Sequence, residues 1–154
     1  MNMQYNFTIA SLGRPTITSP LKISNFTDDK KRLLFKTHTD DFDSMTDKKG
    51  RPLSVELAGP REKIFFHPSK TKAAIVTCGG LCPGINDVIR SITIALYYNY
   101  KVKNIVGIRY GLRGLNPRFG HKPVRLYPDT VKDISNLGGS ILSTSRGPQD
   151  ADIV

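Results

Sequence analysis

The residues best suited to chemistry form a glycine-rich turn between Gly79 and Gly84. The adjacent glycines Gly79 and Gly80 let the main chain bend sharply and approach a ligand closely. A helix that begins directly after such a turn directs free N–H groups and a favourable dipole at the same place, which suits a phosphate group. The turn matches neither G-x-G-x-x-G nor G-x-x-x-x-G-K-[ST], so a purely structural tight turn is the alternative.

A second candidate is Arg146, which lies in the stretch S-T-S-R-G-P-Q-D and is followed by Gly147. Arginine binds phosphate through two parallel hydrogen bonds. The alternative is a surface arginine that pairs with Asp150 or Asp152. Because Arg146 and the glycine turn both follow predicted strands, we expect them at one edge of a sheet, which favours a shared phosphate.

A third loop, R-Y-G-L-R at residues 109–113, also follows a predicted strand. The loop lies at the expected ligand edge, where Tyr110 or Arg113 would be near a nucleotide base. An ordinary surface connection is the alternative, and the residues by themselves leave both open.

These loops need a scaffold of strand, helix and strand. The apolar run Ala73–Thr77 is typical of a central parallel strand covered on both faces. Apolar residues at helical spacing predict a helix over Ile85–Tyr98, and N-I-V-G-I predicts a second strand at Asn104–Ile108. The crossover unit predicts an α/β fold, an incomplete Rossmann-like parallel sheet with flanking helices.

The later elements are shorter. We expect a strand at Val124–Leu126, a helix from Asp129 to about Leu137 that stops at Gly138, a strand at Ile141–Thr144, and the start of a helix at Asp150–Val154.

Residues 1–70 are predicted to form an irregular N-terminal extension, and residues 71–154 the first part of a nucleotide-binding domain. Stretches such as Thr37–Gly50 lack sustained periodicity. Weak strand patterns occur at Thr18–Phe26 and in the alternation of Leu53, Val55 and Leu57.

The net charge of +10 is unevenly distributed, because no acidic residue lies between Asp87 and Asp129. This basic window predicts a solvated face, a face that pairs with acids of an absent domain, or a site for a small anion. Nucleic acid is not expected as a partner, because the window has few aromatics and no recognisable binding motif. No apolar run is long enough to span a membrane and no secretory signal is present, so a cytoplasmic location is the default expectation.

Three motifs together resemble the phosphofructokinase family. Thr77–Arg90 resembles the family's first glycine loop, G-G-x-x-P-G-x-N. Leu137–Gly147 resembles its G-G-[ST] turn, which leads through a strand to an arginine, and Gly107–Leu115 resembles the loop between them. A-G-P-R-E-K-I-F-F and S-R-G-P-Q-D are similar to the subfamily with a long N-terminal extension, whose members with S-R-G-P-Q-D are ATP-dependent 6-phosphofructokinases.

This resemblance implies a glycolytic kinase that transfers the γ-phosphoryl group of ATP–Mg²⁺ to the 1-hydroxyl of fructose 6-phosphate, giving fructose 1,6-bisphosphate. It implies that Gly79, Gly80, Arg146 and Gly147 bind ATP, with Tyr110 as a further candidate. It also implies a homo-oligomer when the enzyme is intact. Two positions depart from many relatives: Leu81 replaces an acid, and Leu112 replaces an aromatic near the adenine.

The family's G-G-D-G-[ST] loop, which holds magnesium, and its T-I-D segment with the catalytic aspartate do not occur in this sequence. No catalytic or metal-binding residue is therefore predicted within it, and we expect the isolated chain to be inactive. A pyrophosphate-dependent phosphofructokinase and a non-catalytic nucleotide- or anion-binding module are the alternative functions.

Overall fold

The computed structural model describes residues 10–36, 46 and 50–150 of the 154-residue chain. The chain divides into two compact units, Met1–Phe65 and Phe66–Val154. The short 3-10 turn η2 (Pro68–Lys70), which leads into the larger sheet, therefore belongs with the second unit.

The first unit consists of two short antiparallel ribbons. β1 (Ile17–Thr18) pairs with β4 (Lys63–Ile64), and β2 (Arg32–Leu34) pairs with β3 (Ser54–Glu56). The predicted alternation around Val55 corresponds to β3, whereas the predicted edge strand at Thr18–Phe26 is reduced to its first residue within β1. Among the described residues up to Phe65, Ser19 is the one buried side chain, so this part of the unit has no apolar core.

The second unit is built on a three-stranded sheet of order β5-β6-β7. β5 (Lys72–Val76) and β6 (Asn104–Ile108) are parallel, with Ala73 opposite Ile105. α1 (Ile85–Ile94) connects them and continues as the π-helical turn η3 (Ala95–Asn99). This confirms the predicted strand–helix–strand unit and its α/β class.

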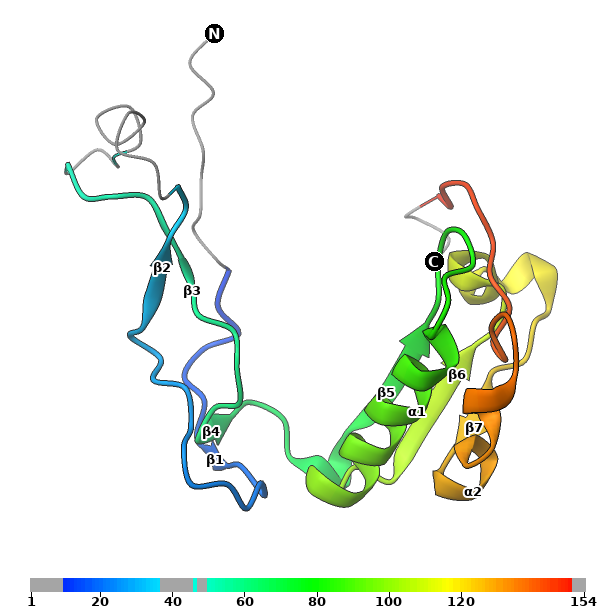
Figure 1. The fold of residues 1–154 in the computed structure, drawn as a ribbon, viewed down its shortest axis with the longest axis horizontal. Coiled ribbons are helices and arrows are strands. Elements are labelled where there is room, and N and C mark those ends of the chain that lie inside the picture. The colour runs from blue at the N-terminus through cyan, green and yellow to red at the C-terminus, as the bar shows by residue number, and fades with distance from the viewer. Residues whose placement is uncertain (1–9, 37–45, 47–49, 151–154) are drawn as a thin grey trace, which may run out of the picture. The chain divides into compact units, whose positions relative to one another are not determined.

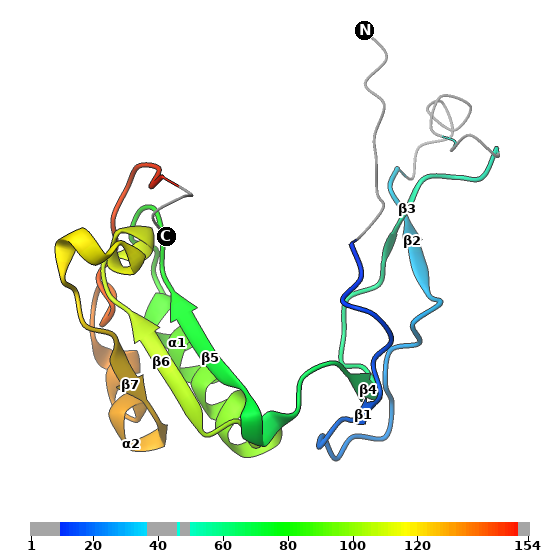
Figure 2. The same ribbon diagram turned by 180° about the vertical axis from the view of Figure 1, so that it is seen from behind.

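The remaining elements follow β6. They are η4 (Gly111–Leu115), η5 (Pro117–Phe119), β7 (Val124–Leu126), α2 (Pro128–Val131) and η6 (Ile134–Asn136). β7 confirms the predicted short strand and pairs antiparallel with β6. Figure 1 and the reverse view in Figure 2 show α1 and α2 on the same face of the sheet.

The core of this unit lies between the sheet and that helical layer. Ile89 of α1 meets Ile105 and Leu126 of the sheet, and all three are almost completely buried. Gly107 is required there because a Cβ at this position would collide with the side chain of Leu142 and lie 3.2 Å from Leu126 Cδ1. Leu142 thus closes the core from a segment outside the sheet.

Three expectations about these elements are wrong. β5 is not covered on both faces, since Ile75 is buried but Ala74 and Val76 are exposed. The α-helices cover one face, and among the described residues the other face is covered only at Ile108, where η4 packs on the carboxyl end of β6.

The predicted strand Ile141–Thr144 is instead a turn. Ser143 has a left-handed φ of 56°, and its N–H donates to the Ser140 carbonyl at 3.0 Å. The Leu142 N–H donates to Ser140 Oγ, so local hydrogen bonds replace strand pairing.

The predicted helix Asp129–Leu137 is divided into α2 and η6. Asp133 (φ −108°, ψ 5°) lies outside helical geometry and separates the two. The predicted helix start at Asp150–Val154 lies outside the described residues except for Asp150, which is not helical.

Candidate phosphate-binding site

The glycine turn and Arg146 lie against each other. A Cβ placed on Gly80 would be 3.2 Å from Nη2 of Arg146, so the guanidinium lies directly beside the main chain of the turn. Figure 1 shows both segments beyond the carboxyl ends of β5 and β6. The two features chosen from the sequence therefore share one edge of the sheet, where ligands bind in open α/β folds.

Side-chain and main-chain hydrogen bonds join the two segments. Thr77 Oγ1 donates to the Ser143 carbonyl at 2.8 Å, and Thr144 Oγ1 donates to the Gly79 carbonyl at 2.7 Å. The Gly79 N–H donates to the Ser145 carbonyl at 3.1 Å. The segment that carries Arg146 is thus fixed to the turn at three successive positions, which limits the movement of both.

These hydrogen bonds give Gly79 and Gly80 different roles. The Gly79 amide already has an acceptor within the protein, whereas the Gly80 amide donates to no other described residue. Gly79 also has a φ of 90°, which favours glycine and shapes the turn. Gly80 rather than Gly79 therefore offers an available donor in this structure.

Arg146 is exposed and forms no ion pair with another described residue, Asp150 included. Asp152, the other predicted partner, lies outside the described residues. Gly147 follows with a φ of 98° and with open space where a Cβ would project. The guanidinium is therefore available to an anion from solvent.

Tyr110 belongs to the same cluster through its main chain. Its N–H donates to the Leu142 carbonyl at 2.9 Å, and its carbonyl accepts a hydrogen bond from Ser145 Oγ at 2.6 Å. Its ring packs on His121, with centroids 4.4 Å apart. The guanidinium of Arg109 is a second partner of this half-buried ring, with Cζ 5.4 Å from the ring centroid. The predicted loop thus lies beside the phosphate-binding candidates.

Asn86 is a positioning residue that sequence reasoning missed. It is 3% exposed; its Nδ2 donates to the Leu137 carbonyl, and its Oδ1 accepts from the Ile141 N–H, both at 2.9 Å. One side chain in the first turns of α1 therefore holds both ends of the second glycine turn. The available signal was the last position of the motif G-G-x-x-P-G-x-N, which Asn86 occupies in this sequence.

A cavity of about 370 Å³ lies between the two glycine turns, at the N-terminus of α1. Its lining comes from both turns, from α1 and from η6: Leu81, Cys82, Pro83, Gly84, Asn86, Asp87, Ser135, Leu137, Gly138 and Gly139. Cys78 and Cys82 are free thiols. Within the described ranges, no three His, Cys, Asp or Glu side chains form a group that could hold a metal ion.

Comparison with known proteins identifies the family of this chain. The phosphofructokinase family model matches residues 72–153, which include the whole three-stranded sheet and both glycine turns. The chain belongs to the phosphofructokinase family. This confirms the resemblance that the three motifs predict.

Three relatives in this family are named ATP-dependent 6-phosphofructokinase. The ATP-dependent 6-phosphofructokinase of Entamoeba histolytica is 56% identical over 100 residues, covering 65% of this chain and 23% of that protein. The enzyme of the same name from Borreliella burgdorferi is 43% identical over 155 residues, covering 95% of this chain and 34% of that protein. That of Amycolatopsis methanolica is 56% identical over 99 residues, covering 64% and 21%.

This phosphofructokinase chain therefore spans between about a fifth and a third of the length of these relatives. Among its described residues, no helix combines the length and the apolar character needed to cross a lipid bilayer.

Proposed function

We propose that the chain forms one wall of the ATP site in an ATP-dependent 6-phosphofructokinase. The complete enzyme would transfer the γ-phosphoryl group of ATP to the 1-hydroxyl of fructose 6-phosphate. The observation that carries this proposal is the contact between Arg146 and Gly80 at the ligand edge of the sheet. The names of the relatives support ATP as the donor.

In this proposal the residues of the site hold and orient the polyphosphate. The Gly80 amide donates to a phosphate oxygen, and Arg146 forms two charge-assisted hydrogen bonds that offset developing negative charge. The Gly79 amide keeps the turn closed through the Ser145 carbonyl, and the positive φ of Gly147 lets the chain pass close to the ligand. Tyr110 contacts the nucleoside.

Magnesium would neutralise charge on the β- and γ-phosphates when bound. The described residues provide no set of three ligands for it. We therefore assign the metal ligands, the general base and the fructose 6-phosphate site to the portion of a phosphofructokinase that this chain does not cover. We also propose that the intact enzyme is a cytoplasmic homo-oligomer.

Without a general base and metal ligands, the isolated chain has no turnover, because each of these contributes orders of magnitude in rate. A chimera supplies the missing parts. The segment of the Borreliella burgdorferi enzyme that matches this chain is replaced by this chain, which aligns over 95% of its length. Formation of fructose 1,6-bisphosphate is then followed in a coupled assay with ATP and Mg²⁺.

The proposal requires that the chimera turns over with ATP and that Arg146→Ala lowers kcat/KM about 100-fold or more, as removal of one charge-stabilising donor does elsewhere. Arg146→Lys should retain part of the rate, since it keeps the charge but loses the bidentate geometry. Lys132→Ala, an exposed position next to α2, is the control and should leave the rate unchanged.

A chimera active with pyrophosphate but not with ATP would contradict ATP binding at this wall of the site. A folded chimera that is inactive with both, while the isolated chain binds ATP through Arg146, would favour the non-catalytic module.

A further inference from the structure

The segment that carries Arg146 is exposed between two residues that are not. Residues 146–148 are all exposed, and no hydrogen bond between main-chain groups joins them to another described element. Ser145, directly before them, donates from its Oγ to the Tyr110 carbonyl at 2.6 Å. Gln149, directly after them, is half-buried. The position of the Arg146 main chain therefore depends on the contacts of Ser145 and Gln149.

Gln149 is held by a side chain from the connection between η4 and η5. The Nδ2 of Asn116 donates to Gln149 Oε1 at 3.3 Å, across 33 positions of sequence. The Nε2 of Gln149 donates to the carbonyl of the preceding Pro148 at 3.0 Å, which leaves its amide oxygen for Asn116. Both groups of the Gln149 amide are therefore used, one within its own segment and one to join that segment to the η4–η5 connection.

The amide nitrogen of Asn116 has no other use among the described residues. Asn116 is 6% exposed, and its Oδ1 accepts from the Arg118 N–H at 3.0 Å, which caps η5. Serine would also cap this turn, because serine and asparagine are both preferred where a helix begins. The cap therefore needs only the oxygen of Asn116, and the contribution of its Nδ2 is the hydrogen bond to Gln149.

The connection that holds both Ser145 and Gln149, residues 109–120, is closely packed. A Cβ on Gly111 would lie 3.1 Å from Ser145 Oγ, so η4 lies directly against the segment that carries the arginine. Pro117 restricts the residue before it to an extended backbone, and Asn116 has a corresponding φ of −79° and ψ of 115°. The exposed segment is thus held at both ends by one support with little freedom to move.

We propose that Asn116 and Gln149 are positioning residues for Arg146. Together with the contact of Ser145, the hydrogen bond between them fixes the main chain on both sides of the arginine and so keeps its guanidinium beside Gly80. A group fixed in this way loses less conformational entropy when it binds a phosphate. The inference rests on the proposed function, because it concerns the phosphate assigned to that site. Neither amide touches the phosphate, and both act through the arginine.

A cycle of variants in the chimera described above tests whether Gln149 acts through Arg146. We expect Gln149→Ala to lower kcat/KM for ATP about tenfold, because a displaced charge-stabilising group costs rate steeply. In the Arg146→Ala background the same substitution should lower kcat/KM by less than about twofold, because two changes that act through one group are not additive. An equal factor in both backgrounds would overturn the inference.

Asn116→Ser separates the hydrogen bond from the cap of η5. It keeps an oxygen for the Arg118 N–H and removes the donor to Gln149, so the urea midpoint should stay close to the wild-type value. We expect its kcat/KM to fall as in Gln149→Ala, and the double variant to lose no more than either single one. A full rate in Asn116→Ser would show that the hydrogen bond does not position the arginine.

The order of the segment is measured in the full chain, without ATP or turnover. In the wild type, NMR relaxation should give the Gly147 amide an order parameter near about 0.85, and Gln149→Ala should lower it below about 0.6. The amide of Ile105, in the buried part of β6, is the reference and should not change. An unchanged order parameter at Gly147 would mean that Gln149 does not hold the segment, and the inference would be wrong.

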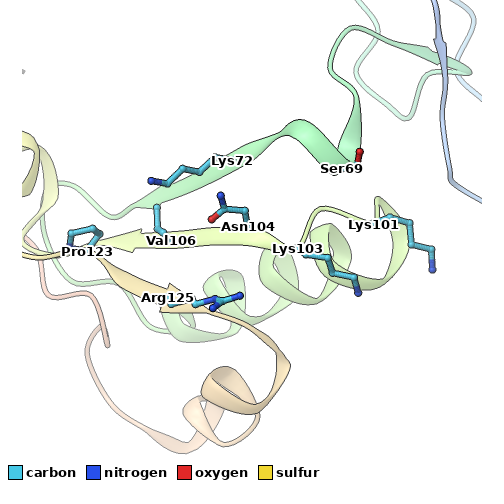
Figure 3. Close-up of a pocket in the computed structure, with 8 residues that line it drawn as sticks. All are labelled: Ser69, Lys72, Lys101, Lys103, Asn104, Val106, Pro123 and Arg125. Carbon is cyan, nitrogen blue, oxygen red and sulfur yellow. The ribbon is translucent and has the colours of Figure 1, made fainter.

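A second group of cations would attract the same anions, so its contribution has to be measured. A cavity of about 590 Å³ lies at the amino ends of β5 and β6, the opposite edge of the sheet from Arg146. Half of its lining residues are Lys or Arg, and none is acidic. Figure 3 shows them: Ser69, Lys72, Lys101, Lys103, Asn104, Val106, Pro123 and Arg125. Arg125→Ala therefore serves as the control for anion binding away from Arg146.

The Kd of the full chain for inorganic tripolyphosphate distinguishes failure of this inference from failure of the proposed function. An inactive chimera would reject the proposed function, but Gln149→Ala should still raise this Kd about fivefold, whereas Arg125→Ala should not raise it. Equal increases for both variants would reveal general attraction to a cationic chain and overturn the inference. An active chimera in which Gln149→Ala changes neither kcat/KM nor the Gly147 order parameter would reject the inference alone.

Discussion

The guanidinium of Arg146 occupies the space beside Gly80 that a side chain at position 80 would need, with Nη2 3.2 Å from the position of that missing Cβ. Gly80 is therefore required for close approach and not for a positive φ, unlike Gly79. The two residues are 66 positions apart in sequence and are held together by the hydrogen bonds of Thr77, Thr144 and Gly79.

Gly80→Ala should weaken ATP binding to the chain with little loss of stability. The added methyl group displaces the flexible end of Arg146, which is exposed and yields easily. We expect about a tenfold increase in the Kd for ATP, measured by isothermal titration, and an unfolding midpoint in urea within error of the wild type. Lys132→Ala, at an exposed position next to α2 and outside the candidate site, is the control. Unchanged ATP affinity in Gly80→Ala would remove the shared phosphate from the proposed site.

Gly107→Ala should destabilise the second unit because its methyl group enters the space of Leu142. Overpacking of this kind costs about 1–3 kcal/mol, and Leu142→Ala by itself costs about 2–5 kcal/mol through the cavity it leaves. The double variant should cost less than the sum, since each change relieves the other. Urea unfolding followed by circular dichroism gives all three values. Strict additivity would show that the two side chains do not compete for one space.

Asn86→Ala should loosen the second glycine turn. It leaves the Leu137 carbonyl and the Ile141 N–H without their partner, and because both bonds are only partly buried each loss should cost less than the roughly 1–3 kcal/mol of a fully buried unsatisfied group. Hydrogen exchange at the Ile141 amide should accelerate more than exchange in β6. Asp87→Ala, at the exposed neighbouring position, should change stability by only about 0.5 kcal/mol through the helix dipole. Equal effects of the two substitutions would argue that Asn86 has no special positioning role.

Tyr110→Ala separates recognition of the base from recognition of phosphate. If the ring contacts the nucleoside, the substitution weakens ATP binding about five- to tenfold and leaves binding of inorganic tripolyphosphate unchanged, since base–aromatic stacking contributes about 1–3 kcal/mol. Tyr110→Phe retains the ring and should bind ATP almost normally. A parallel loss for ATP and tripolyphosphate would instead indicate that Tyr110 only supports the Ser145 segment through its carbonyl.

The strand–helix–strand unit was predictable because its signals are local. Ile75, Ile89 and Ile105 lie in runs whose periodicity identifies their elements, and all three are buried as expected. The proximity of Gly80 and Arg146 was predictable from topology, because the carboxyl ends of parallel strands lie at the same edge of a sheet.

Other parts were decided by contacts that no local pattern reveals. Ile141 and Leu142 were predicted to form a strand because they are apolar and branched. Leu142 instead packs into the core beside Gly107, and the left-handed φ of Ser143 prevents an extended backbone. The run at β5 was predicted to be buried on both faces because parallel strands normally are. The composition of one strand does not show whether the described residues provide a covering layer on each face. Asn86 was missed because its two partners, Leu137 and Ile141, lie more than fifty residues away.

The two ribbons of the first unit bear on the order of events during synthesis. Their residues leave the ribosome before the sheet of the second unit exists, yet within the described part of that unit Ser19 is the one side chain removed from water. Burial on this scale cannot offset the conformational entropy lost on ordering the ribbons. The ribbons, although synthesised before the sheet, are therefore expected to become ordered after it, which reverses the usual amino-to-carboxyl order of folding.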